Sequence, residues 1–328
     1  MCKIIHSYLN YNTMHNMIMK TKYFKNEMLK TLNIKVFGEE RISMLYKYPL
    51  GFFLLNDYQM ARKVYDDVIQ QIPDENSREF NIYYDCWLYL YAKLAGHLNA
   101  NKHYLKINNN KSFLGGFSAL PNDDPEIRAT AISCLCAFLE NDKETLIGAA
   151  DFLLHMQQLN ENENNFYFMC NSKGELIKSF PEKSERKYIF ETKVARPLLY
   201  SFPLATIALL SAYFVTQNPS YLNSAKKYSE KILQNDFRND YCGKSAVAMS
   251  LMYYFTRDLQ YFNLLQKLVE YINTTYTDNE QHIHNGKILT ADRLSEYVIG
   301  IEFCKSSSRK CLPSKIVKFL NKNINNNF

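Results

Sequence analysis

Two adjacent carboxylates are the first candidates for chemistry in this sequence. Asp123 and Asp124 lie in the stretch GGFSALPNDDPE, which stands just before the apolar run from Ala129 to Leu139. Two carboxyl groups that share a partly apolar site separate their pKa values, so one of them can stay protonated and act as a general acid. The alternative is structural, because an aspartate before a helix commonly caps its first turn. The sequence leaves both interpretations open.

Further polar residues lie where apolar helical runs are predicted to begin. If these helices run side by side in one direction, their first turns meet at one end, where the helix dipoles favour anions. Lys244 and Arg196 are candidate anchors for an anionic substrate group, although either can instead pair with a nearby acid. Glu296, one turn into the last apolar run, is a third candidate catalytic residue. The other candidate substrate-binding residues at these helix starts are Tyr84, Asp85, Arg128, Tyr200 and Asp292.

The elements that would position these residues form a repeating pair. A helix that is apolar nearly all round is followed by a short polar turn and an amphipathic helix, which is typical of a buried helix and its surface partner. In the best example Leu198–Gln217 precedes Ser220–Gln234, with Ser220 as the expected cap. The other predicted pairs are Tyr46–Leu55 with Tyr58–Ile72, Ile82–Leu94 with Ala100–Ile107, Glu126–Leu139 with Lys143–Leu159, Gly243–Thr256 with Leu259–Tyr276, and Ala291–Cys304 with Pro313–Lys322.

Six such pairs predict an all-α fold. The buried helices start near residues 46, 82, 126, 198, 243 and 291, at intervals of 36 to 48 residues apart from one gap of 72, and periods of this size mark repeat architectures. Alternating residues around turns predict small inserted β-hairpins in Asn165–Phe180 and Gln281–Leu289. We therefore expect an (α/α)6 toroid of six helical hairpins, with the β-hairpins over one mouth. An open solenoid is the alternative, but it would leave apolar helix faces in water.

Length and composition are consistent with one large domain. The 328 residues are 47% hydrophobic and include 25 Tyr and 21 Phe, which is ample material for a core and an aromatic cavity wall. We expect a toroid domain over residues 41–323, an N-terminal helical extension over 1–40 and a disordered tail over 324–328. The net charge of +6 is scattered over polar helix faces, which argues against nucleic-acid binding.

The cysteines and the opening residues favour a cytoplasmic location. The eight cysteines do not form the dense pattern of a small secreted domain, and several lie in apolar helical runs, as reduced thiols do. The first twenty residues lack the continuous apolar segment of a signal peptide. The most apolar run, Leu198–Val215, contains Pro203 and several hydroxyl groups. We expect it to form a buried helix and not a membrane span.

The Gly-Gly-Phe turn gives the chain a resemblance to a known superfamily. Gly115-Gly116-Phe117, followed after an acidic loop by Ala129-Thr130-Ala131-Ile132-Ser133, resembles the repeat of the terpenoid cyclase and protein prenyltransferase toroids. Arg196-Pro197, the segment PSYLNSAKKYSEKIL and Gly243-Lys244-Ser245 also look like bacterial proteins of that superfamily with no settled activity. The resemblance implies an α/α toroid and carries little about reaction type. Class II terpenoid cyclases use an Asp-x-Asp-Asp acid, and Asn122-Asp123-Asp124 lacks its first aspartate.

The same resemblance raises the question of a zinc site. Protein prenyltransferases bind zinc through an Asp-x-Cys in one repeat and a His in the next, and here Asp240-Tyr241-Cys242 precedes His282 and His284. Asp, Cys and His are acceptable zinc ligands. The separation is short for that family, however, and the two histidines alternate like strand residues. We therefore expect no tightly bound zinc and no cofactor.

Three functional hypotheses follow. The first is an enzyme that cyclises or isomerises a largely apolar small molecule, with or without an anionic group, by acid–base catalysis in the manner of terpenoid cyclases. The second is a carbohydrate-active toroid of the sugar-epimerase or unsaturated-uronide-hydrolase type, which shares the six hairpins; the single tryptophan, Trp87, argues against it because such sites use tryptophan platforms and paired histidines. The third is a non-catalytic binding protein. The substrate and the oligomeric state have no signature in the sequence.

Overall fold

The structure is a computed structural model that describes residues 11–72, 82–180, 188–190, 199–234, 242–275 and 294–301, with the side chains of 11–20 and 273–275 left out. The chain divides into two compact units: a terminal unit, Met1–Asn76 with Asp236–Phe328, and a central unit, Ser77–Asn235. Helices dominate the described residues of both, and β structure there is limited to one two-stranded sheet and isolated bridges. The predicted all-α class with a small β insertion is confirmed. No helix within these ranges is long and apolar enough to cross a membrane.

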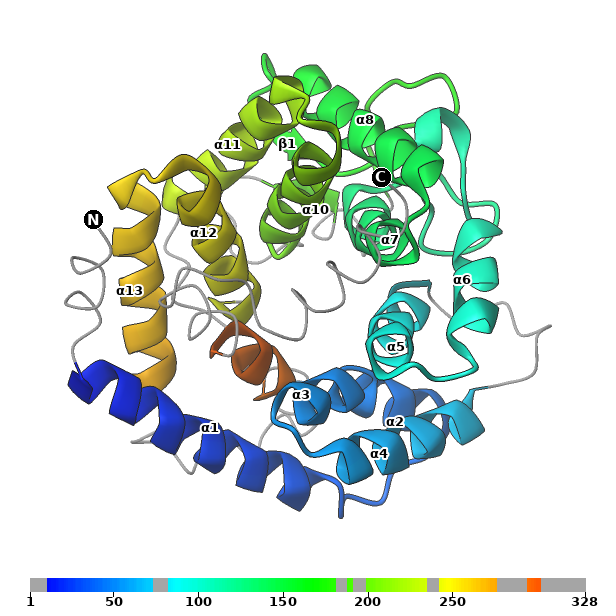
Figure 1. The fold of residues 1–328 in the computed structure, drawn as a ribbon. Coiled ribbons are helices and arrows are strands. Elements are labelled where there is room, and N and C mark those ends of the chain that lie inside the picture. Colours follow the sequence, from blue (N-terminus) through cyan, green and yellow to red (C-terminus); the bar gives the residue numbers. More distant parts are fainter. Residues whose placement is uncertain are drawn as a thin grey trace. The chain divides into compact units, whose positions relative to one another are not determined.

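The central unit contains three of the predicted hairpins (Figure 1). In each, a helix buried on nearly all sides precedes a helix with an exposed face, as the hydrophobic patterns predict. The helix that opens the second hairpin, α7, contacts the helices that open the other two, α5 and α10. The three pairs are α5 (Ile82–Ala95) with α6 (Ala100–Asn108), α7 (Ile127–Glu140) with α8 (Lys143–Leu159), and α10 (Ser201–Thr216) with α11 (Pro219–Gln234).

Short polar turns end the buried helices of this unit. Asn141 and Gln217 adopt left-handed conformations, with φ of 64° and 56°, directly after α7 and α10. Asparagine tolerates this conformation better than most residues, and such a residue commonly ends a helix. Asp142 then caps α8, because its carboxylate accepts a hydrogen bond from the Thr145 amide at 3.0 Å. Two residues therefore suffice to reverse the chain between α7 and α8.

The predicted starts of α10 and α11 are wrong by three residues and by one residue. The helix predicted from Leu198 begins at Ser201, which places Pro203 in the first turn, where proline removes no intrahelical hydrogen bond. Ser220 does not cap α11, since the helix already begins one residue earlier. Asn218 fills that role instead, and its side-chain oxygen accepts from the Ser220 amide at 3.1 Å.

The Gly-Gly-Phe turn packs directly against α8. Gly115 has φ of +76°, and a Cβ built on it would lie 2.3 Å from the carbonyl carbon of Gly148. A Cβ on Gly116 would meet an aromatic ring of α8 at 2.6 Å. The amide of Phe117 donates to the hydroxyl of Thr130 in α7 at 2.8 Å. The turn therefore needs glycine for close approach, and it ties α7 to α8.

The small sheet differs from the predicted hairpin. A turn does form inside the predicted hairpin Asn165–Phe180, because the amide of Asn171 donates to the carbonyl of Glu175 at 2.9 Å. The regular pairing, however, joins β1 (Phe166–Tyr167) to β2 (Ile189–Phe190) in an antiparallel sheet. Both strands are buried, so burial selects this more distant partner. The second predicted β-hairpin, before the last apolar helix, lies outside the described residues.

The terminal unit combines segments from both ends of the chain. Two of its helix pairs, α3 with α4 and α12 with α13, are predicted hairpins, and α1 contacts α13. The start predicted at Tyr46 is wrong, because Tyr46 is the C-cap of α2 and Pro49 occupies the first turn of α3. The helices are α1 (Tyr11–Thr31), α2 (Gly38–Leu45), α3 (Tyr48–Leu54), α4 (Tyr58–Gln71), α12 (Cys242–Thr256), α13 (Leu259–Thr275) and residues 294–301. The predicted helix Pro313–Lys322 lies outside the described residues.

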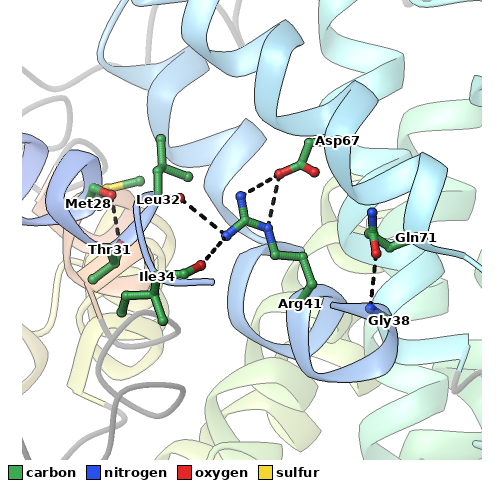
Figure 2. Close-up of polar contacts among 8 residues, drawn as sticks. All are labelled: Met28, Thr31, Leu32, Ile34, Gly38, Arg41, Asp67 and Gln71. Atoms are coloured by element: carbon green, nitrogen blue, oxygen red, sulfur yellow. Dashed lines mark hydrogen bonds and ion pairs between the residues drawn. The ribbon is translucent and has the colours of Figure 1, made fainter. Parts of the chain in front are cut away.

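Arg41 joins three helices of the terminal unit, as Figure 2 shows. Its guanidinium donates to the carbonyl oxygens of Leu32 and Ile34, at 3.3 and 3.1 Å, just beyond the end of α1. The same group lies 2.6 Å from the carboxylate of Asp67 in α4. The first amide of α2 donates to the side chain of Gln71 at 3.0 Å. These bonds hold the short helix α2 against its neighbours. The expected domain boundary at residue 40 stays a prediction.

Candidate functional site

A carboxylate and a guanidinium meet where three helices of the central unit begin. Glu126 immediately precedes α7, and Arg128 lies in its first turn. Arg128 Nε and Nη2 lie 2.7 and 2.6 Å from Glu126 Oε1, and Nη1 donates to the Tyr200 hydroxyl at 3.2 Å. Tyr200 is the N-cap residue of α10, and the ring of Tyr83, in the first turn of α5, lies 5.4 Å from the guanidinium carbon. We call these four residues the central cluster.

The charges of the central cluster are largely removed from water. Glu126 is 1% exposed, and within the described part of the chain its Oε2 atom has no hydrogen-bond partner. Burial opposes the charge on Arg128, but Glu126 and the Tyr200 hydroxyl outweigh it and raise the pKa of the guanidinium well above its usual value. Burial, followed by the charge of Glu126, raises the pKa of the nearby Tyr188 phenol. A buried acceptor without a partner is costly, and here it offers a site for a ligand hydroxyl or proton.

Asp123 and Asp124 do not cap α7. The helix begins at Ile127 with Glu126 at the N-cap position, and no side chain caps the first turn. Pro125 explains the displacement, because the residue before a proline avoids the helical region. Asp123 lies in an exposed position, and partial desolvation and then repulsion from Asp124 raise the pKa of its carboxyl. The capping interpretation is therefore wrong, and the general-acid role stays a prediction.

The remaining candidates of the central unit are placed differently. Asp85 faces the surface helix α6, where its carboxylate lies 2.8 Å from Nδ1 of His103, and both side chains are buried. This contact joins the two helices of the first hairpin. Tyr84 is half-buried in the first turn of α5, and Arg196 lies outside the described residues. The structure thus brings Arg128 and Tyr200 together, while substrate binding by Asp85, Tyr84 or Arg196 stays a prediction.

A second buried charge cluster lies in the terminal unit. The ammonium groups of Lys47 and Lys244 both contact Glu296 Oε1, and the three residues are 1%, 4% and 2% exposed. We call them the terminal cluster. Burial opposes ionisation of Glu296, but Lys244 and then Lys47 outweigh it and lower the pKa of the carboxyl. The predicted anchor and the predicted catalytic acid are therefore neighbours, and their roles in function stay predictions.

Glycine allows the terminal cluster to form. A Cβ on Gly243 would lie 2.4 Å from the carbonyl oxygen of Glu296, and a Cβ on Gly300 would lie 2.9 Å from that of Gly243. The backbones of α12 and of helix 294–301 are therefore in direct contact. Lys244 follows Gly243 in the first turn of α12, which places its side chain beside the carboxylate.

The proposed zinc ligands lie almost wholly outside the described residues. Asp240, His282 and His284 fall there, as does Asp292. Cys242 is described and is buried at the first position of α12. In the described ranges no three His, Cys, Asp or Glu side chains gather as a metal site would require. The expectation of no bound zinc stays a prediction.

Sequence reasoning missed three members of the two clusters. Glu126 has an ordinary explanation as the start of a helix, although an acid and a base two positions apart at a helix start are a signal for a local ion pair. Tyr83 and its neighbour Tyr84 are equivalent candidates in the sequence, because periodicity alone does not fix which aromatic residue faces the next helix. Lys47 carried no local signal, since its partner Glu296 is 249 positions away.

The described elements define a class of all-α protein built from helical hairpins, with buried charge clusters where helices begin. No known family profile matches the chain, and no curated protein does. Among solved structures, the chain is similar to the Lin0763 protein from Listeria innocua, with 15% identity, a TM-score of 0.57, and coverage of 83% of this chain and 86% of that one. It is also similar to a D-mannose isomerase, with 11% identity, a TM-score of 0.54, and coverage of 84% and 97%. These likenesses show a shared fold, and they do not confirm the resemblance to terpenoid cyclases.

Proposed function

We propose that the protein is a carbohydrate-active enzyme of the isomerase or epimerase type, with the central cluster as its site. The observation that carries this proposal is the buried Glu126 Oε2 atom, an acceptor without a described partner at the junction of three helix starts. The fold shared with a D-mannose isomerase supports the same class. A sugar supplies what the cluster lacks, namely hydroxyl groups for the open acceptor and an apolar ring face for the aromatic residues.

The chemistry requires one base and a group that stabilises negative charge. In an open-chain sugar, Glu126 takes the proton from the carbon next to the carbonyl, and the electrons move onto the carbonyl oxygen. The Arg128 guanidinium and the Tyr200 hydroxyl stabilise that oxygen as its negative charge grows. Return of the proton to the former carbonyl carbon, with transfer of the neighbouring hydroxyl proton to the former carbonyl oxygen, converts an aldose to a ketose. Return to the same carbon inverts its configuration only if the enediolate turns its other face to Glu126 or a second acid supplies the proton. One carboxylate thus suffices for the isomerisation.

Aromatic rings take the place of the tryptophan platform that the sequence lacks. The rings of Tyr83 and Tyr200 lie 6.1 Å apart between centroids, and both adjoin the guanidinium. Trp87 is 5% exposed and serves the core of the central unit. In this proposal the small-molecule partner is a sugar, and cytoplasmic location stays a prediction.

Proton exchange with solvent tests the proposal directly. The purified protein is incubated in D2O with D-mannose, D-glucose or D-fructose, and ¹H NMR follows loss of the proton at C2 of the two aldoses or at C1 of D-fructose, together with growth of a second sugar. We expect exchange with at least one sugar, and a fall of roughly 10²–10⁴-fold for Glu126→Gln. Glu140→Gln is the matched control, because Glu140 is an ion-paired acid at the other end of α7. Full activity of a folded Glu126→Gln protein would refute the role of Glu126, and the absence of exchange and binding with every sugar would refute the function.

A second candidate function rests on the raised pKa of Asp123. A carboxyl group with a raised pKa stays protonated to a higher pH than usual and is suited to donate a proton, as the cyclase-like hypothesis requires. Asn keeps the shape of Asp but has no transferable proton. The turnover of polyprenyl substrates is therefore measured for Asp123→Asn and Asp124→Asn, and melting curves of both variants show whether they are folded. Loss of product from one folded variant would support cyclisation, and unchanged turnover in both would exclude these acids.

A further inference from the structure

The backbone of Glu126 is held on both sides by neighbouring segments. Glu126 is extended, with φ of −128° and ψ of 153°, and its amide donates to the carbonyl of Phe117 at 3.0 Å. On the opposite side it forms an antiparallel bridge with Met169. Next to this bridge, the amide of Ile127 donates to the carbonyl of Phe168 at 3.0 Å. The position of the proposed base is therefore set by two segments outside α7.

Thr130, in the first turn of α7, binds the same carbonyl of Phe117. Its hydroxyl donates to that oxygen at 3.4 Å and accepts a hydrogen bond from the Phe117 amide at 2.8 Å. The amide of Thr130 in turn donates to the carbonyl of Glu126 at 3.0 Å. Glu126, Phe117 and Thr130 thus form a closed ring of hydrogen bonds. The Thr130 hydroxyl is the side-chain member of this ring, and the other members are backbone groups.

Burial makes this ring sensitive to the loss of the hydroxyl. Thr130 and Phe117 are both 0% exposed, and a buried amide that loses its acceptor is costly. Without the hydroxyl, the backbone of Phe117 has to reorient toward another acceptor. The turn is confined on the side of α8, where a Cβ on Gly115 would lie 2.3 Å from the carbonyl carbon of Gly148. The displacement therefore falls on Phe117 and on the amide of Glu126 that is bound to it.

We propose that Thr130 is a positioning residue for the proposed reaction, and that it acts through Phe117 to hold Glu126 in place beside Arg128. This inference rests on the proposed function, and it gives the Gly-Gly-Phe turn a role in the site. Glu126 Oε1 lies 2.7 Å from Arg128 Nε, so a shift of the Glu126 backbone disturbs both this contact and the place of Oε2. A displacement of about 1 Å at a catalytic group can lower the rate about 100-fold.

Four variants separate positioning from stability. Thr130→Val removes the hydroxyl, keeps the shape of the side chain and leaves no room for a water molecule in its place. Thr130→Ala and Thr130→Ser differ from each other by that hydroxyl alone, and this pair decides the question if the valine variant does not fold. Thr206→Val is the matched control, because Thr206 is also 0% exposed and its hydroxyl donates to the carbonyl of Phe202 within α10 at 2.9 Å.

The turnover of whichever sugar shows exchange is the first readout. We expect kcat to fall roughly 10–100-fold in Thr130→Val while KM changes by less than about threefold, because the base is displaced and the other ligand contacts stay. The kcat of Thr130→Ser should stay within about threefold of the natural value, and that of Thr206→Val within about twofold. An unchanged kcat in folded Thr130→Val, or equal values in Thr130→Ala and Thr130→Ser, would overturn the inference.

A second readout needs no substrate, so the inference and the proposed function can fail separately. The Nε–H group of Arg128, assigned from its loss in Arg128→Met, is followed by ¹⁵N NMR. Its exchange with water should quicken about tenfold or more in Thr130→Val, because the ion pair with Glu126 opens more often. The same comparison applies to Thr130→Ala against Thr130→Ser, and the rate should stay constant in Thr206→Val.

The two readouts together decide the outcome. An exchange rate that the loss of the Thr130 hydroxyl leaves unchanged, or that Thr206→Val raises equally, would overturn the inference. If the rate rises as expected while no sugar is turned over or bound, Thr130 still positions Glu126 and the proposed function fails.

Discussion

Replacing Glu126 with glutamine tests the electrostatics of the central cluster without reference to any substrate. The amide keeps the shape of the side chain but leaves the Arg128 charge without its counterion. The Arg128 side chain is only 14% exposed, so water compensates little. Breaking a buried ion pair from one side costs about 3–5 kcal/mol. Because Arg128 keeps its bond to Tyr200 and some exposure, we expect a loss of about 3 kcal/mol.

The assay uses the only tryptophan of the chain. Trp87 lies in α5, so its fluorescence during urea unfolding reports on the central unit, and linear extrapolation gives the free energy of unfolding. The double variant Glu126→Gln with Arg128→Met removes the stranded charge and should recover to within about 1 kcal/mol of the natural protein. Glu140→Gln, whose side chain is 24% exposed, should cost about 1 kcal/mol or less. A Glu126→Gln protein no less stable than this control would refute the reasoning.

Three further predictions concern stability. Gly115→Ala should lower the free energy of unfolding by about 3 kcal/mol or more, since its Cβ would lie 2.3 Å from a backbone carbon. Gly96→Ala shares a positive φ but has nothing within 4 Å, and it should lower that free energy by only about 1–2 kcal/mol. Equal losses in urea unfolding would contradict the close approach at Gly115. The lowered pKa of Glu296 adds stability above the unfolded value of about 4.3, and that stability is lost as pH falls through the lower folded pKa. An acid titration followed by circular dichroism should therefore show that the stability of Glu296→Gln depends less on pH than that of the natural protein. Identical titration curves for the two proteins would contradict a role of Glu296 in acid stability. Tyr221→Phe removes a hydroxyl that donates to a carboxylate of α8 at 2.7 Å and should cost about 1 kcal/mol, which thermal melts can measure.

Local patterns predicted the helices well because the forces that set their limits are local. The helix Lys143–Leu159 has the predicted bounds, since its cap Asp142 and its apolar periodicity both lie within a few residues of it. The start of α10 was wrong by three residues because the apolar run before Pro203 continues past the helix itself. Hydrophobic pattern reports burial, and it does not report where the backbone becomes helical.

The candidate site was only partly predictable because its contacts cross between hairpins. The sequence places Arg128 and Tyr200 at helix starts, and the structure joins them across 72 positions of the chain. The pairing of β1 with β2 likewise needed a partner beyond the local turn. Glu126 was overlooked since a glutamate at a helix start has an ordinary explanation in the helix dipole. Its Oε2 atom has no hydrogen-bond partner among the described residues, as is also true of Glu296, and this property of three-dimensional packing has no signature in the sequence.

The contact of Lys47 with Glu296 has a consequence for biosynthesis. The central unit is one continuous stretch, Ser77–Asn235, whereas the terminal unit needs both ends of the chain. A nascent chain emerges from the ribosome at about 5–20 residues per second, so the first segment waits roughly 10–45 s before Glu296 is made. During that interval Lys47 and Gly51 lack the helix 294–301 that they contact in the finished protein, while the central unit can already fold. Chaperones that bind nascent chains would therefore contact this protein within its first 76 residues. A pause in translation before codon 296 would lengthen the time for which that segment lacks its partner.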